Sequence, residues 1–173
     1  MSYKYHTTIY TGKGKKPKNI YWTNDIFYTS KTIKDKVMVI QLDNGQNKFY
    51  DEQAQLLEQD LSTARSKNLT VLLFAHIQIH TGDSNDTVYK SMLGSDTSEN
   101  GISVKDFIDS GKVVDLIKNN GDIIKGIFTG HQHADFYTEI KAKTKDGEDT
   151  VIPQYILTGN MYDNGHLIKI NVK

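Results

Sequence analysis

Three of the six histidines in this 173-residue chain lie directly after two short apolar runs. His76 ends the run TVLLFAH, whereas His131 and His133 end the run GIFTGHQH with one residue between them. Neutral imidazole nitrogens are suitable ligands for zinc, iron, manganese or nickel. The sequence contains no cysteine, so any metal site must use histidine, carboxylate, amide or backbone oxygen ligands.

The placement of these histidines depends on the elements that precede them. Residues 70–76 and 122–128 are mostly apolar, which is typical of buried strands in a parallel sheet. Because the carboxyl ends of parallel strands lie along one edge of the sheet, we expect the three histidines to converge there. Gly130 should allow the backbone to turn sharply just before His131.

The surrounding sequence supplies the alternating elements of an α/β fold. Residues 36–43 are expected to form a buried strand, and residues 51–67 an amphipathic helix with acids in its first turn. A second helix is expected over residues 104–120. We therefore predict a mixed sheet with flanking helices. A meander of three strands should follow, at residues 135–143, 149–159 and 166–172.

We divide the chain into an N-terminal extension, residues 1–35, and a main domain, residues 36–173. The extension is polar and aromatic, with a basic loop GKGKKPK and a stretch IYWTNDIFYTS that we predict as an edge strand. Within the main domain, residues 77–101 are rich in Ser, Asp, Asn, Thr and Gly, and we expect a long loop there.

The composition excludes some classes of partner. Lys and Arg number 21, as do Asp and Glu, so no overall field favours nucleic acid or an anionic membrane. No apolar run approaches the ~20 residues needed to span a bilayer, and the first residues lack the apolar core of a signal peptide. The sequence does not indicate a compartment.

Four segments, in order along residues 36–173, resemble the calcineurin-like metallophosphoesterases, the superfamily that includes the purple acid phosphatases. VMVIQLDNG is similar to the family's strand ending in Leu-Asp, and QAQLLEQDL is similar to its Gln-x-x-Leu helix. FAHIQIH and FTGHQHAD resemble the last two signature elements, a histidine that ends a strand and a later Gly-His-x-His turn. The similarity covers the family's C-terminal half.

This resemblance implies an α/β sandwich of two packed sheets with helices outside, of which the chain carries one part. It also implies hydrolysis of a phosphoester substrate by a site with two divalent ions, Mn, Fe or Zn. His76 and His131 would then bind one of the two metal ions, and His133 would bind the other.

The chain departs from the family pattern before His76. Family members carry an Asp-x-His element, a bridging Gly-Asp aspartate and a Gly-Asn-His element there, and this chain has none of them. Without a bridging anion nothing offsets the repulsion between two dications, so we expect at most one metal ion, weakly bound. On this interpretation the chain is an inactive part of a phosphoesterase.

Three residues of the polar loop are further candidates for the metal site or its pocket. Asp83 and Asp86 follow closely on His76 and could fold back toward a metal ion. His80 lies four residues after His76 and is a candidate pocket residue. Turn formation explains both aspartates equally well, and His80 also fits a solvent-exposed rim position.

Two other interpretations stay open. The chain could be a non-catalytic interaction or structural module with a degenerate phosphoesterase fold, or a domain whose histidines are ordinary loop residues. Without the family's N-terminal half, one apolar face of the sheet would be exposed. We therefore expect that face to be covered by the N-terminal half, a companion chain, a second copy or the aromatic N-terminal segment of this chain.

Overall fold

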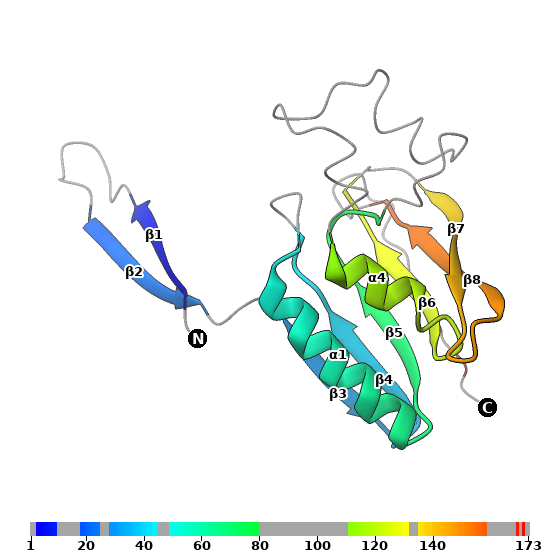
Figure 1. The fold of residues 1–173 in the computed structure, drawn as a ribbon. Coiled ribbons are helices and arrows are strands. Elements are labelled where there is room, and N and C mark those ends of the chain that lie inside the picture. Colours follow the sequence, from blue (N-terminus) through cyan, green and yellow to red (C-terminus); the bar gives the residue numbers. More distant parts are fainter. Residues whose placement is uncertain are drawn as a thin grey trace.

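The computed structural model describes six stretches of the chain and two single residues near its end. These are residues 3–9, 18–24, 28–44, 49–79, 111–131 and 135–158, with residues 169 and 171. Side chains are described in all of them except residues 3–9 and 18–24 and position 136. A six-stranded sheet with helices packed on it forms the main body (Figure 1).

The main sheet is mixed and has the strand order β3-β4-β5-β6-β8-β7. Its strands are β3 (Thr29–Ile33), β4 (Val37–Gln41), β5 (Thr70–Phe74), β6 (Ile124–Thr129), β7 (Phe136–Lys143) and β8 (Asp149–Ile156). The four inner strands are parallel, whereas β3 and β7 pair antiparallel at the two edges. The predicted α/β fold with a mixed sheet and flanking helices is confirmed.

Helix α1 (Asp51–Ser66) connects β4 to β5, close to the bounds that the sequence predicts. Its first turn contains two acidic residues and its last turn contains Arg65. These charges interact favourably with the helix dipole at both ends. Its buried face carries the expected apolar residues at helical spacing, namely Ala54, Leu57, Leu61 and Ala64. The apolar stripe alone therefore locates the face that packs on the sheet.

Helix α4 (Lys112–Lys118) precedes β6 and buries Val113, Val114 and Ile117. The sequence predicts a longer helix over residues 104–120, of which residues 104–110 lie outside the described part. At the other end α4 stops at Lys118, and Asn119 and Asn120 form the turn into β6. Asn120 Nδ2 donates to the Leu116 carbonyl at 2.8 Å, which ends the helix with a side-chain hydrogen bond.

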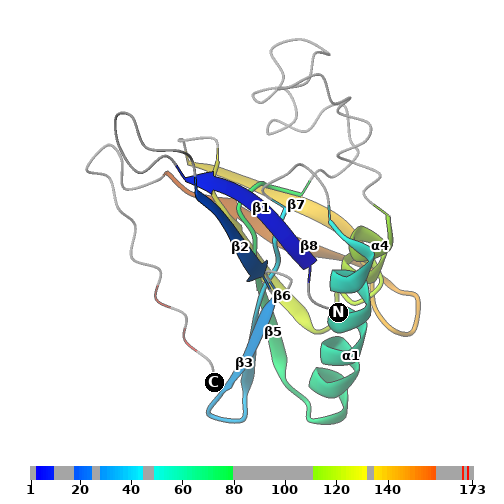
Figure 2. The ribbon, with the colours of Figure 1, turned by 90° about the vertical axis from the view of Figure 1, so that its left-hand side faces the viewer.

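Both helices cover the same face of the sheet (Figure 2). The core between these layers contains fully buried side chains from strands and helices: Ile40, Leu73, Ile127, Leu57 and Ile117. The other face, which we call the open face, carries a smaller cluster around Val39, Leu72, Phe74 and Phe128. Neither described helix packs on the open face.

The N-terminal region contributes to two different sheets. Strands β1 (Tyr3–Ile9) and β2 (Lys18–Asn24) pair antiparallel as a separate two-stranded sheet. Strand β3, which the sequence assigns to the end of the extension, instead hydrogen-bonds to β4 along its whole length. The structure therefore places the end of the predicted extension at the edge of the main sheet.

The C-terminal strands pair differently from the predicted meander. β7 and β8 form an antiparallel hairpin, and Gly147 adopts a φ of 84° in its turn. β8 then inserts between β7 and β6 and runs parallel to β6. In this position Ile152, Gln154 and Ile156 are buried on the helix side of the sheet. Burial of the two isoleucine side chains stabilises the strand order β6-β8-β7. The predicted strand at 166–172 lies almost wholly outside the described residues.

Arg65, near the end of α1, ties this helix to the turn before β6. Its guanidinium pairs with both carboxylate oxygens of Asp122, with an Nη2–Oδ1 distance of 3.0 Å, and Nη2 also donates to Asn120 Oδ1 at 2.8 Å. The hydrogen bond from Arg65 holds the pKa of the Asp122 carboxyl below its usual value.

We expect Asp122→Asn to lower the free energy of unfolding at pH 7 by less than about 1 kcal/mol, because solvent weakens partly exposed ion pairs. A carboxyl with a depressed folded-state pKa stabilises the protein above its unfolded pKa, and this contribution is lost as the pH falls through the folded pKa. Urea denaturation at neutral and acid pH measures the difference, with Glu58→Gln as a control. A stability difference between wild type and Asp122→Asn that persists in strong acid would contradict the lowered pKa of Asp122.

Candidate metal centre

His76 and His131 follow adjacent parallel strands at the carboxyl edge of the sheet. His76 lies two residues beyond the end of β5, and His131 two residues beyond the end of β6. The backbone N–H of Gly130 donates to the carbonyl of His76 at 3.0 Å, so the strand pairing continues past both strand ends. The structure therefore brings two of the three candidate metal ligands side by side.

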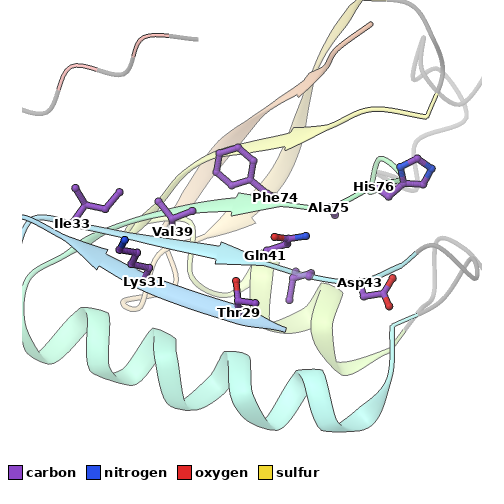
Figure 3. Close-up of a pocket in the computed structure, with 10 residues that line it drawn as sticks. Thr29, Lys31, Ile33, Val39, Gln41, Asp43, Phe74, Ala75 and His76 are labelled. Atoms are coloured by element: carbon purple, nitrogen blue, oxygen red, sulfur yellow. The ribbon is translucent and has the colours of Figure 1, made fainter. Parts of the chain in front are cut away.

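The two imidazole rings meet edge to face. Nε2 of His76 and Nδ1 of His131 are 3.3 Å apart, and the ring planes are inclined at 78° with centroids separated by 5.1 Å. His76 is exposed and His131 is half-buried, and Figure 3 shows the His76 ring beyond the end of β5. The pair therefore lies at the surface of the sheet edge.

The backbone turn at this site falls on His131 itself, which has a φ of 73°. The sequence predicts this turn at Gly130, but among the described glycines only Gly111 and Gly147 have positive φ. Left-handed backbone is uncommon for residues with a Cβ and costs energy, so the surrounding structure must enforce it. The strained residue is the one whose ring contacts His76.

The spacing of the two nitrogens fits a shared metal ion. Ligand nitrogens bind zinc at about 2.0–2.1 Å, and a tetrahedral angle between them places the nitrogens roughly 3.3–3.4 Å apart. The observed 3.3 Å agrees with this separation. A direct hydrogen bond between one protonated and one unprotonated nitrogen also agrees with it, and the tautomers decide between the two.

The ligand set is incomplete within the described residues. No group of three or more His, Asp or Glu side chains in this part of the chain is placed to hold a metal ion. The other candidates, His133, His80, Asp83 and Asp86, lie outside the described residues. Two imidazoles alone make a weak site, because structural and catalytic zinc sites use at least three protein ligands.

Asp43 shares a groove with His76 and was not among the residues singled out from the sequence. The groove encloses about 810 Å³ and runs from Asp43 and His76 along the open face past Phe74 to Ile33 (Figure 3). The run VMVIQLD, which ends a buried strand in an aspartate, is the signal that could have identified it.

Buried side-chain amides fix the backbone around the site. Gln53 in α1 accepts from the Asp43 backbone N–H at 2.8 Å and donates to its carbonyl at 2.7 Å. Asn44 makes the same two bonds with Ile77, at 2.9 and 2.7 Å. Each side-chain amide thus bonds to the backbone N–H and C=O of a residue beyond the end of its strand, where no described strand pairs with it.

Gln154 of β8 fixes the backbone of Ile79 in the same way. Its side chain accepts from the backbone N–H of Ile79 at 2.7 Å and donates to the Ile79 carbonyl at 2.8 Å. Asn44 and Gln154 therefore hold residues 77 and 79, directly after His76. No sequence pattern distinguishes these amides, because their partners lie 33 and 75 residues away.

Two buried polar groups close to the histidines have no hydrogen-bond partner among the described residues. They are both amide atoms of Gln78, which is fully buried, and the hydroxyl oxygen of Thr129, which is 5% exposed. Gln78 lies two residues after His76, and Thr129 two before His131. Unpaired buried polar groups are costly and recur at functional sites.

Comparison with known proteins adds no identification to this geometry. The sequence matches no protein-family model, and no curated protein is significantly similar to it. Neither described helix is long and apolar enough to cross a membrane. The functional argument therefore depends on the site itself.

Proposed function

We propose that this chain is the C-terminal part of a metal-dependent phosphoesterase and contributes histidine ligands to its two-metal site. The observation that carries the proposal is the 3.3 Å approach of His76 Nε2 and His131 Nδ1, at the carboxyl ends of adjacent parallel strands. The ordered resemblance of four segments to calcineurin-like metallophosphoesterases supports the same assignment. We propose Mn, Fe or Zn as the metal.

In this proposal the residues of the chain have separate tasks. His76 and His131 present nitrogen lone pairs to one ion, and His133 is assigned to the second. Asn44 and Gln154 position the backbone that follows His76. Divalent ions in such a site polarise the phosphate and supply an activated water. The remaining ligands, including a bridging carboxylate, come from an N-terminal half or a companion chain.

A second candidate function is a non-catalytic interaction module. The open face favours it, because Tyr137, Val151 and Ile33 on that face are about half exposed. Large apolar side chains gathered on one face are typical of a binding surface. In this alternative the histidine pair is a hydrogen-bonded remnant of the site.

Phosphodiester hydrolysis separates these functions. The release of p-nitrophenol from bis(p-nitrophenyl) phosphate with Mn²⁺ should be measured for the product of the complete reading frame and for the 173-residue chain. We expect metal-dependent turnover by the complete product, a loss of roughly 100-fold with His131→Ala, and no change with His6→Ala in β1. The 173-residue chain alone should show only background hydrolysis.

Two outcomes would contradict the proposal. Full activity of the complete product carrying His131→Ala would remove the histidine from the site. Rapid turnover by the 173-residue chain would show that its ligand set is complete. A complete product with no activity, and with no Asp-x-His or Gly-Asn-His element upstream, would favour the interaction module.

A further inference from the structure

A row of aromatic side chains crosses the open face at one register of the sheet. Phe74 and Phe128 stack with centroids 5.0 Å apart, Phe128 and Tyr155 follow at 5.4 Å, and Tyr155 and Tyr137 at 5.4 Å. Strand pairing places these residues directly opposite one another, from β5 through β6 and β8 to β7. The two tyrosines are exposed, by 37% and 55%, so the row is accessible from solvent.

Lys31 on β3 and Glu139 on β7 flank this row at the two edges of the sheet, and Lys141 follows Glu139 on the same face of β7. The row begins at Thr29 on β3 and ends at Tyr137 on β7. Lys31 and Glu139 each lie two residues further along, toward the amino ends of the parallel strands, and so share the open face. Lys31 lines the groove of Figure 3, and Glu139 accepts a 2.8 Å hydrogen bond from the Tyr137 hydroxyl.

We propose that a second copy of this chain takes the place of an N-terminal half on the open face, around a two-fold axis parallel to the strands. In a six-stranded sheet, the axis that sets Lys31 of β3 over Glu139 of the partner's β7 passes between β5 and β6. The same axis sets Phe74 opposite the partner's Phe128 at the centre. One geometry therefore pairs unlike charges at both edges and aromatic rings in the middle, as an isologous interface requires.

The packing distances allow this arrangement. Sheets stack face to face at about 10 Å with nearly aligned strands, which a lysine and a glutamate can span. Six strands at about 4.8 Å and five residues at about 3.3 Å give a face of roughly 500 Å², or about 1,000 Å² in total. This area lies at the lower limit of specific interfaces, so the dimer should be weak and depend on concentration.

The axis also places the two carboxyl edges at the same end of the dimer. Each His76 then lies on the strand opposite the partner's His131, so four imidazoles approach the axis. This last point depends on the proposed metal site, whereas the dimer does not. Dimer formation is therefore measured in EDTA, so that a failure of the dimer can be distinguished from a failure of the metal site.

Sedimentation equilibrium of wild type and charge-reversed variants over a wide concentration range tests the dimer. Lys31→Glu alone and Glu139→Lys alone each replace two attractions by two repulsions, and should weaken the dimer about tenfold. The double variant should restore wild-type affinity to within about threefold. Lys145→Glu, in the exposed β7–β8 turn, is the control and should have no effect.

A chain that stays monomeric at every concentration would overturn the proposal. A dimer that neither single reversal weakens, or that the double variant fails to restore, would also overturn it, because the axis would then lie elsewhere. A stable complex with an N-terminal half of the same gene product on this face, in place of the dimer, would identify that half as the occupant and contradict a second copy.

Discussion

Replacing Gln154 by alanine should lower the free energy of unfolding by about 2–4 kcal/mol, although Gln154 is not one of the candidate metal ligands. The side chain is fully buried, and its amide makes both backbone hydrogen bonds of Ile79. Alanine leaves a buried N–H and a buried C=O unpaired, and each carries most of its desolvation cost.

Chemical denaturation of wild type and Gln154→Ala measures this loss. Gln55→Ala is a matched control, because Gln55 is exposed on α1 and the same amide is removed without burial. The control should change stability by less than about 0.5 kcal/mol. Equal effects at the two positions would show that the bonds of Gln154 to Ile79 do not hold the loop.

The same variant should also loosen the candidate metal centre. Gln154 and Asn44 fix residues 79 and 77, which follow His76 directly. Partners that orient a metal ligand commonly change metal affinity by 10–100-fold when they are removed. Loss of the hydrogen bonds from Gln154 to Ile79 should therefore weaken metal binding even under conditions where the protein remains folded.

Local patterns in the sequence predict helix α1 and the strands β5 and β6. The spacing of Ala54, Leu57, Leu61 and Ala64 locates both α1 and the face that it buries. The apolar runs before His76 and His131 become the adjacent parallel strands β5 and β6. These patterns are local, because a helix stripe and a buried strand each depend on neighbouring residues.

Features that depend on distant pairing are not visible in the sequence. β8 pairs with β6 instead of continuing the predicted meander, and its Ile152 and Ile156 are fully buried. The hydrogen bonds between buried side-chain amides and the backbone join residues up to 75 positions apart. The positive φ falls on His131, and nothing in the Gly-His dipeptide indicates which residue turns.

We propose that His76 and His131 bind the same metal ion. Their nitrogens stand 3.3 Å apart, which fits both a shared ion and a direct hydrogen bond. Metal binding and the hydrogen bond are exclusive, because a shared ion requires an unprotonated lone pair on each of the two nitrogens.

Calorimetric titration of the chain with Zn²⁺ distinguishes these states. Wild type should bind the ion weakly, and His76→Ala and His131→Ala should each lower the affinity by roughly tenfold or more, because each removes one of the two described candidate ligands. His6→Ala should bind as wild type does. Equal zinc affinity in all four proteins would contradict the shared site and leave the histidine pair as a hydrogen bond at the sheet edge.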